Sequence, residues 1–269
     1  MTAAAARTIW QLNQDPAQYS AYVPDTEAGI TLALQESGVE AVALPANGLA
    51  VLDQYSEDNV WTVEVWGPFL PVPTQSAITT AVDAVMMHIK KRPAHVNFFF
   101  GQENSRVRAS LAQYGARLSR HTIWQMQAIP ATMIKKEIQH YTAPLPADQQ
   151  QQVLQLHRQF FTGDAVTDVS VERPLWVAWQ DAQPVGYALA EVDIDHVGHL
   201  LYVAVAPAAQ HQGWGQALMA VVWQDMQISG VNSVILVQSQ QNAQVAGAVY
   251  QRLSFKQLKT LIAVTIQLA

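Results

Sequence analysis

Two glycines at the start of a predicted helix form the most informative feature of this chain. Gly213 and Gly215 follow a β-branched run at residues 203–205 and a turn at Pro207, and an amphipathic helix follows them. Glycine has no Cβ, so the backbone N–H groups beside it can approach an anion closely. The N-terminus of a helix adds unpaired N–H donors and a partial positive charge. The pattern therefore predicts a site for a pyrophosphate.

Two other glycine motifs that bind phosphates do not fit these residues. The Walker loop ends in Gly-Lys-Ser/Thr, whereas this chain continues as Gly215-Gln216-Ala217. The dinucleotide fingerprint needs a third glycine, and Leu218 stands at that position. A plain turn between a strand and a helix is the alternative to a ligand site.

The composition is that of an ordinary globular protein and excludes several kinds of site. The chain has 269 residues, enough for two domains, and 50% are hydrophobic. Its net charge of −6 argues against binding to nucleic acid and is compatible with a cationic amine. The absence of cysteine excludes disulfides, thiolate metal sites and a covalent cysteine intermediate. No secretory signal or long apolar run is visible, so we expect a cytoplasmic protein with no membrane partner.

The hydrophobic pattern of the second half predicts the order strand, helix, three strands, helix, strand, helix, strand. Gly230 is a suitable residue to end the second of these helices. The predicted ranges are, in order, 134–141, 145–160, 175–179, 185–192, 200–205, 216–228, 234–237, 243–253 and 261–268.

The stretch from about Leu200 to Phe255 closely resembles the acetyl-CoA-binding region of the GNAT superfamily of N-acetyltransferases. The order of elements is that of the GNAT fold, an α/β (α+β) fold in which helices flank a mixed, mostly antiparallel sheet. The resemblance implies that the pantetheine arm of acetyl-CoA pairs with the backbone of the strand before the loop, and that the pyrophosphate lies on the loop. For the side chain of Trp214, the alternative is that it simply packs on the sheet. The implied cofactor-binding residues are Val203, Ala204, Val205, Gln210, His211, Gln212, Gly213, Trp214, Gly215 and Gln216.

A second element of the family, an Asn before a helix that carries Tyr and leads to Gly-Phe, has a partial counterpart. Asn242 stands one residue further from Tyr250 than is common, and Ser254 replaces the glycine. The resemblance implies that Asn242 contacts the cofactor and that Tyr250 protonates the leaving thiolate. A Tyr250 that only packs on the sheet is the alternative.

The general base that many family members carry has no direct counterpart. They place Glu in the strand before the glycine loop, where the nearest matching position here is Leu201. An alkylamine still needs a base, because only about one in several thousand is neutral at pH 7. Glu191 and His199 are the candidates, directly or through a water, and each is otherwise an ordinary strand or hairpin residue. Tyr202 is a candidate for lining the acceptor site.

The first half repeats the later part of this order without its glycines. At an offset of about 139 residues, Gly213 corresponds to Thr74, and Pro71 and Pro73 nearby each remove a backbone N–H. We therefore expect no second pyrophosphate site. The predicted elements are strands 61–66, 96–100 and 120–126 and helices 77–91 and 105–114.

This repetition predicts two GNAT-like domains. Residues 1–130 would form a degenerate domain that shapes the substrate cleft or an interface, and residues 131–269 would form the acetyltransferase domain. An unrelated α/β domain is the alternative for the first half. A monomer and a homodimer are both compatible with this arrangement.

The run from Asp193 to His199 contains carboxylates and imidazoles, yet its place between two predicted strands indicates a hairpin turn. A metal site needs ligands on a rigid framework, so we expect no metal. The pairs Lys90-Lys91 and Lys135-Lys136 are expected to be solvated surface. No Gly-x-Ser-x-Gly elbow supports a hydrolase.

Together these features predict acyl transfer from acetyl-CoA, as co-substrate, to an amine of a small molecule or peptide by direct attack. Two other classes stay open. A non-catalytic acyl-CoA sensor or scaffold would suit the missing glutamate. A peptide ligase that depends on aminoacyl-tRNA has tandem GNAT-like folds, although the intact glycine loop and the acidic balance argue against it.

Overall fold

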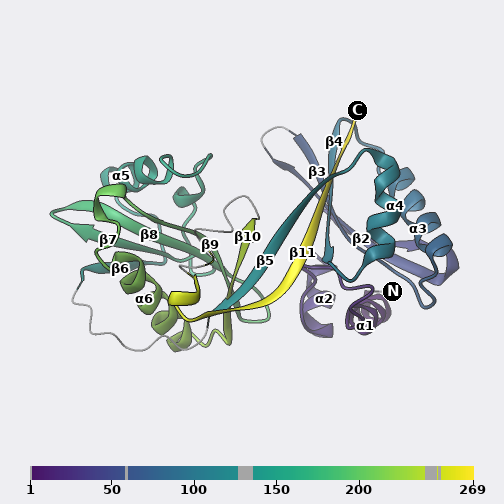
Figure 1. The fold of residues 1–269 in the computed structure, drawn as a ribbon, viewed down its shortest axis with the longest axis horizontal. Helices are drawn as coiled ribbons and strands as arrows, with labels where there is room; N and C mark the ends of the chain where they lie inside the picture. Colours follow the sequence, from purple (N-terminus) through teal and green to yellow (C-terminus); the bar gives the residue numbers. More distant parts are fainter. Residues whose placement is uncertain (1, 58–59, 127–135, 240–246, 248–249) are drawn as a thin grey trace. The chain divides into compact units, whose positions relative to one another are not determined.

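The computed structural model describes residues 2–57, 60–126, 136–239, 247 and 250–269, and the chain divides into two compact units (Figure 1). Unit 1 comprises Met1–Thr122 and Lys259–Ala269, and unit 2 comprises Ile123–Leu258. The predicted domain division between residues 130 and 131 lies outside the described residues and stays a prediction.

Unit 1 is a sheet with helices packed on it, in the hydrogen-bonded order β1-β2-β3-β4-β11-β5. Strands β3 and β4 run parallel, whereas β1–β2, β2–β3 and β4–β11 are antiparallel. The elements are α1 (Thr2–Asn13), α2 (Glu27–Ala33), β1 (Val39–Leu44), β2 (Gly48–Glu57), β3 (Val60–Phe69), α3 (Gln75–His88), β4 (Ala94–Gly101), α4 (Ser105–Leu111), β5 (Arg117–Met126) and β11 (Phe255–Leu268).

The core of unit 1 follows from two periodicities in its sequence. Val96 and Phe98 alternate along β4, and Ile78, Val82 and Val85 recur at helical spacing along α3. All five side chains are at most 1% exposed and belong to one cluster. Each such side chain contributes about 1.5–3 kcal/mol on burial, so α3 is fixed on this face of the sheet.

A short segment after α1, residues 18–21, lies where β3 and β4 separate, and we call it the plug. The parallel pairing of the two strands ends at Val65, although β3 continues to Phe69. On the β3 side, the Gln18 side-chain oxygen accepts a 2.7 Å hydrogen bond from the Leu70 N–H. On β4, the plug is held by Ala21 N–H to the Phe99 carbonyl (2.8 Å) and by Gly101 N–H to the Tyr19 carbonyl (3.1 Å).

Unit 2 continues the sheet in the order β5-β10-β9-β8-β7-β6. Strands β9 and β10 run parallel, whereas β6–β7, β7–β8 and β8–β9 are antiparallel. The elements are β6 (Ile138–Tyr141), α5 (Ala147–His157), β7 (Leu175–Gln180), β8 (Gln183–Val192), β9 (Val197–Val205), α6 (Trp214–Ile228) and β10 (Ser233–Ser239).

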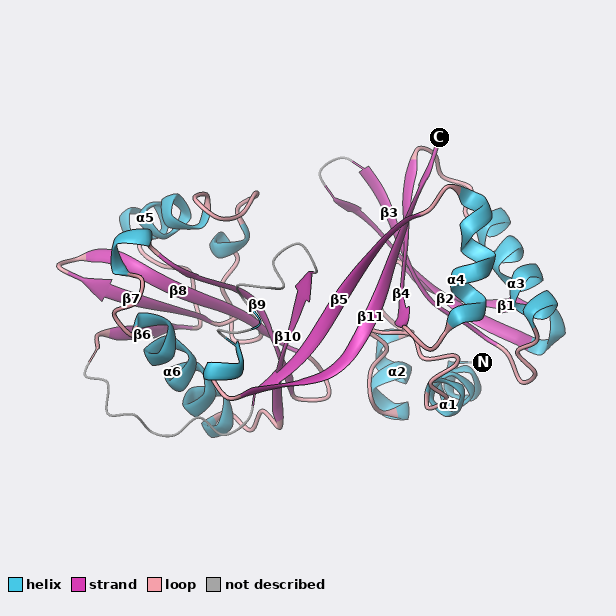
Figure 2. Ribbon diagram, viewed as in Figure 1, coloured by secondary structure: helices cyan, strands magenta, loops and turns pink. Residues whose placement is uncertain are grey.

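Helices α5 and α6 cover opposite faces of the unit 2 sheet (Figure 2). Leu189 and Ala190 are neighbours on β8 and therefore point to opposite faces. Leu189 packs with Val153 of α5, and Ala190 packs with Leu218 and Val222 of α6. We refer below to the α5 face and the α6 face of this sheet.

The structure confirms the predicted fold class, a mixed and mostly antiparallel sheet flanked by helices. Nearly all predicted strands and helices are present, with ends shifted by a few residues. Four elements of unit 1 were not predicted, namely α1, α2, β1 and β2. The predicted helix 243–253 lies largely outside the described residues, and residues 250–252 are helical. Within the described residues, no helix is long and apolar enough to span a membrane.

Candidate functional site

The most unusual feature of unit 2 is the separation of two parallel neighbours in the sheet. The pairing of β9 with β10 ends at Leu200 opposite Leu236. Strand β9 nevertheless continues to Val205, and β8 stays paired with it up to that residue. The edge of β9 from Tyr202 to Val205 that faces away from β8 therefore presents backbone N–H and C=O groups without a strand partner among the described residues, which suits an extended ligand.

A β-bulge lies at the point of separation. Tyr202 is paired with Leu189 and Leu200 with Ala190, so Leu201 is an extra residue in β9. Its side chain is 38% exposed. Bulges leave a backbone unit out of the ladder and are frequent beside functional sites. This is also the position at which the sequence analysis looked for a family glutamate and found Leu201.

The glycine loop leads from β9 into α6 with free backbone donors. Gly213 has φ +80° and directly precedes the helix, whose N-terminus has no side-chain cap. The N–H groups of Trp214, Gly215 and Gln216 therefore have no partner within the helix. A Cβ added at Gly215 would meet Val205 Cγ2 at 3.9 Å and no other described atom within 4 Å. The open space and the free donors fit a phosphate group.

The polar side chains of the loop hold its shape. Gln210 Nε2 donates to the Val205 carbonyl at 3.1 Å, and Gln212 Nε2 donates to the Ala208 carbonyl at 2.8 Å. His211 has φ +61° and its side chain is exposed. These side chains support the loop, so a ligand would meet mainly its backbone.

Trp214 packs inward, as the alternative in the sequence analysis held. Its side chain is 7% exposed and belongs to the cluster on the α6 face. Its indole Nε1 is buried without a hydrogen-bond partner among the described residues. The Lys136 ammonium lies 3.8 Å above the ring centroid. Trp214 can therefore offer a ligand its backbone N–H but not its side chain.

Tyr250 lies in unit 2 in an aromatic environment. Its ring centroid is 5.9 Å from that of Trp124 on β5 and 5.6 Å from that of Phe255 on β11. Burial raises the pKa of the Tyr250 phenol, so the group keeps its proton at neutral pH. Asn242 lies outside the described residues.

The two candidate bases face each other across β8 and β9. Glu191 is paired with His199, so both side chains lie on the same face of the sheet. Glu191 is exposed, whereas His199 is half-buried. The His199 Nε2 lies 2.8 Å from Asp193 Oδ2. The structure thus brings both candidates together and adds Asp193, which the sequence analysis had treated only as part of a hairpin run.

Asp193 is held as an anion by the hairpin. Burial alone would raise the pKa of its carboxyl, but hydrogen bonds from His199, Val197 and Asp195 lower it below the usual value. The two backbone bonds measure 2.9 Å and 3.0 Å to Oδ1. An ionised carboxylate only accepts, so the His199 Nε2 is the donor; in a neutral imidazole that donates from Nε2, Nδ1 is the acceptor. Within the described part of the chain, no three metal-ligating side chains gather.

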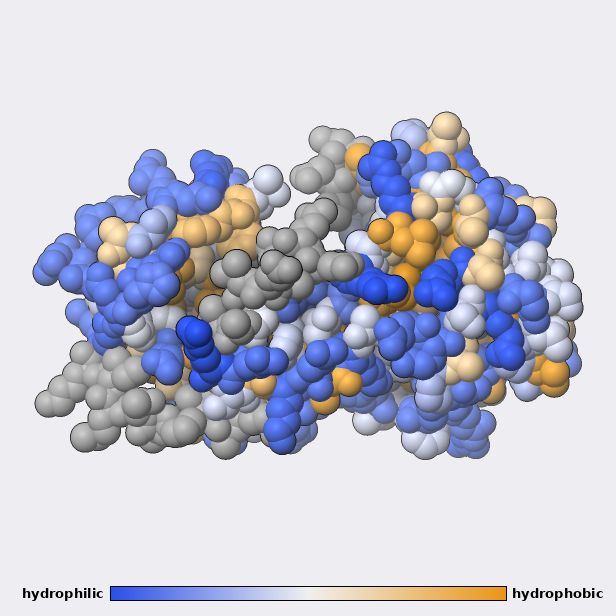
Figure 3. All heavy atoms as spheres, in the orientation of Figure 1, coloured by the Kyte–Doolittle hydropathy of each residue, from blue (hydrophilic) through white to orange (hydrophobic). Residues whose placement is uncertain are grey.

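An aromatic cluster on the α5 face lies beside the bulge, and of its members the sequence analysis singled out only Tyr202. The Tyr202 ring packs edge-on against His157 and Phe161, with centroids 5.0 Å and 4.9 Å away. His157 Nδ1 lies 2.7 Å from the Tyr187 hydroxyl, and both side chains are 0% exposed. Alternation along β9 could have placed Tyr202 on this face, but its contacts with α5 depend on the tertiary fold. Figure 3 shows hydrophobic atoms between the hydrophilic surfaces of α5 and α6 on the face in view.

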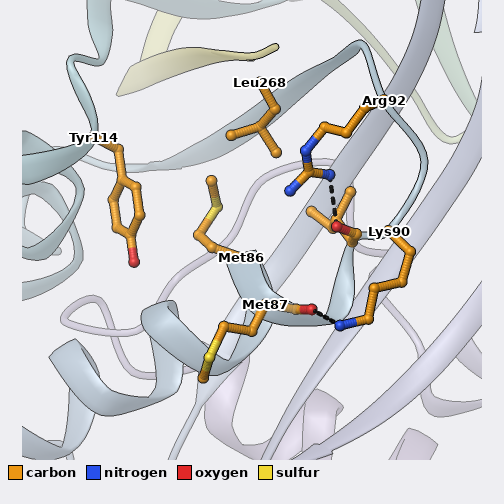
Figure 4. A pocket seen from close by; sticks show the side chains of 7 residues that line it. Met86, Met87, Lys90, Arg92, Tyr114 and Leu268 are labelled. Atoms are coloured by element: carbon orange, nitrogen blue, oxygen red, sulfur yellow. Dashed lines mark hydrogen bonds between the residues drawn. The ribbon is translucent and has the colours of Figure 1, made fainter.

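A hollow of about 390 Å³ lies in unit 1 and not beside these groups (Figure 4). Both of its cationic side chains are engaged with backbone carbonyls at the end of α3. Lys90 Nζ donates to the Met87 carbonyl, and Arg92 donates to the Ile89 carbonyl, each at 2.6 Å. The hollow thus lies in the other unit from the glycine loop, with both cations held at the end of α3, and we do not regard it as the candidate site.

Comparisons with known proteins agree with this geometry. The family model of the acetyltransferase (GNAT) domain matches residues 172–257, which include the glycine loop, the bulge and Tyr250. The matched residues all lie in unit 2. No curated protein matches the sequence.

Solved structures extend the likeness of fold to nearly the whole chain. A GCN5-related N-acetyltransferase from Sphaerobacter thermophilus is 17% identical with a TM-score of 0.69, over 99% of this chain and 93% of that one. A GCN5-related N-acetyltransferase from Kribbella flavida is 15% identical with a TM-score of 0.64, and the match covers 89% of this chain and 93% of that one. A tandem GNAT protein from the clavulanic acid biosynthesis pathway is 13% identical with a TM-score of 0.61, and the match covers 99% of this chain and 94% of that one. The GNAT fold thus continues into the first half.

Proposed function

We propose that unit 2 transfers an acetyl or other short acyl group from acyl-CoA to an amine by direct attack. The observation that carries this proposal is the separation of β9 from β10 beside the uncapped N-terminus of α6. A pantetheine arm, which is extended and carries amide groups, can pair with the open edge of β9 from Tyr202 to Val205. The pyrophosphate suits the free N–H groups of Trp214, Gly215 and Gln216.

His199 is the general base in this proposal. Its Nε2 donates to the Asp193 carboxylate, which leaves the Nδ1 lone pair to take a proton from the amine. Removing that proton from an alkylamine at pH 7 costs about 4–5 kcal/mol, so a base is required. The exposed Glu191 opposite His199 adds a negative charge that favours the approach of a cationic amine.

Tyr250 is the general acid. When the amine nitrogen forms its bond to the acyl carbon, the carbon–sulfur bond breaks and the sulfur leaves as a thiolate. Burial keeps the Tyr250 phenol protonated, so it can donate its proton to that sulfur. Backbone N–H groups at the bulge at Leu201 would stabilise the charge that develops on the carbonyl oxygen.

The experiment that tests the proposal is calorimetric titration of the chain with acetyl-CoA, followed by an acceptor screen with free-thiol detection. Gly213→Asp and Gly213→Asn form a matched pair, because Asn and Asp both tolerate φ +80° and only Asp adds a charge. We expect micromolar binding by the wild type and loss of binding in Gly213→Asp beyond that in Gly213→Asn. A folded wild-type chain that binds no acyl-CoA would refute the proposal.

A further inference from the structure

Lys136 is a cation that contacts Trp214, the first residue of α6, at the end of the glycine loop. The residue precedes β6, and its ammonium lies 3.8 Å above the centroid of the Trp214 ring. A cation over an indole is attracted by the negative face of the ring. We infer that Lys136 is a positioning residue for acyl-CoA, held on Trp214 so that its charge draws the phosphates of the ligand into the loop. This inference rests on the proposed function.

The registers of the sheet bring the two residues to the same end of unit 2. Ile138 is paired with Ala178, Ala178 with Gly186, and Gly186 with Val205, the last residue of β9. This row of residues crosses the sheet at the level where the glycine loop begins. Lys136 lies two residues before Ile138, and its ammonium reaches the ring of the first residue of α6.

The glycine loop, residues 206–216, contains no lysine or arginine of its own. An acyl-CoA ligand carries several negative charges, whereas the side chains of Gln210, Gln212 and Gln216 are neutral. Two other cations of unit 2 are engaged elsewhere: Arg158 lies 2.7 Å from Asp164, and Arg173 lies 3.6 Å from Asp168. Among the described residues, the Lys136 ammonium contacts Trp214, which is the first residue of α6.

Trp214 contributes to the proposed phosphate site through both its backbone and its side chain. Its backbone N–H is one of the free donors at the start of α6, and its ring is buried under the Lys136 ammonium. The Trp214 ring and the Trp214 backbone N–H belong to one residue. The Lys136 ammonium on that ring is therefore held about one side-chain length from the proposed phosphate site. The ring also restricts the flexible lysine stem before the ligand arrives, which lowers the entropy lost on binding.

The test compares ligands with and without phosphates on matched variants. Lys136→Met keeps the aliphatic stem over the indole and removes the charge. Lys256→Met is the control, because Lys256 is an exposed residue of unit 2 on β11. Calorimetry measures acetyl-CoA, acetyl-3′-dephospho-CoA and S-acetylpantetheine, which lacks every phosphate, at two salt concentrations. Thermal melting checks that each variant is folded.

We expect Lys136→Met to weaken acetyl-CoA binding about three- to tenfold, as for one partly desolvated charge contact, and to reduce its salt dependence. Binding of S-acetylpantetheine and binding by Lys256→Met should not change. Trp214→Leu should weaken acetyl-CoA binding, and Lys136→Met should add little to it, because the two residues act together.

Other outcomes would overturn the inference. Equal binding of acetyl-CoA by wild type and Lys136→Met would show that the lysine only covers the ring. An equal loss for acetyl-CoA and S-acetylpantetheine would show a structural effect without a role for phosphate. In both cases the proposed function would stand, because the wild type binds. A folded wild type that binds neither ligand would refute the proposed function and this inference together.

Discussion

Replacing Gly215 by Ala distinguishes a glycine that a ligand requires from one that folding requires. An added Cβ would lie 3.9 Å from Val205 Cγ2, an ordinary van der Waals distance, and φ is not in the left-handed region. Alanine is more favourable than glycine within a helix by about 0.5–1 kcal/mol. We therefore expect Gly215→Ala to leave the melting temperature unchanged or to raise it by about 1–4 °C.

The same methyl group should weaken acetyl-CoA binding. It would project into the open space beside the free N–H groups at the start of α6. Loss of one hydrogen bond to a charged phosphate costs about 1.5–3 kcal/mol. This corresponds to an affinity about 10- to 150-fold lower by calorimetry. A more stable protein that binds its ligand less well would be the signature of a glycine retained for function.

Gly230 provides the opposite control, because it has φ +80° beyond the end of α6 and no atom within 4 Å of an added Cβ. Gly230→Ala should cost about 1–2 kcal/mol of stability through backbone strain alone and leave acetyl-CoA affinity unchanged. The reasoning is refuted if Gly215→Ala binds acetyl-CoA as tightly as the wild type, or if it loses as much stability as Gly230→Ala.

The remaining predictions concern the catalytic groups and the number of binding sites. Tyr250→Phe should lower turnover about 10²-fold or more with acetyl-CoA affinity nearly unchanged, and unchanged turnover would remove Tyr250 from the mechanism. Asp193→Asn keeps an oxygen for the hairpin N–H groups but loses the acceptor for His199, so turnover should fall about 10- to 10²-fold. Because the pKa of Asp193 is lowered by folding, its carboxylate stabilises the protein above about pH 4, and this contribution is lost as the pH falls through the lower folded value. Denaturation of the wild type and Asp193→Asn at pH 7 and pH 2.5 should therefore show a larger stability difference at pH 7 than at pH 2.5. Calorimetry should give one acetyl-CoA per chain, and residual binding at a second site in Gly213→Asp would contradict the role of the plug.

The helices and strands of the second half of the chain could be predicted because their sequence patterns are local. The apolar runs of β7 and β8, the helical spacing of α6 and the glycine pair are all patterns of residues close together in the sequence. The family resemblance then supplied the fold, a mixed and mostly antiparallel sheet flanked by helices, which periodicity cannot give. The four unpredicted elements of unit 1 carry weaker patterns. For example, β1 has the burial pattern ieeBeB, in which only Val42 and Leu44 are buried, and α2 is only 7 residues long.

The parts of the candidate site that escaped sequence analysis are contacts between distant residues. His199 was a candidate, but its hydrogen bond with Asp193 depends on a hairpin whose turn had no distinctive sequence. Lys136 was expected to be solvated surface, because nothing near it in the sequence predicts an indole 78 positions later. The structure corrects that expectation, since Lys136 is half-buried over Trp214.

The plug is a physical reason to expect a ligand in unit 2 and none in unit 1. Both units have a parallel strand pair that separates before its strands end, at Val65 in unit 1 and at Leu200 in unit 2. In unit 1 the plug bonds three backbone groups beside the separation, and Thr74 caps α3 by accepting from the Ala77 N–H at 3.2 Å. In unit 2 the corresponding helix has Gly213 in place of a cap. Because exposed backbone donors in a fold need partners, the plug and the Thr74 cap supply in unit 1 the kind of contact that we propose a ligand supplies in unit 2.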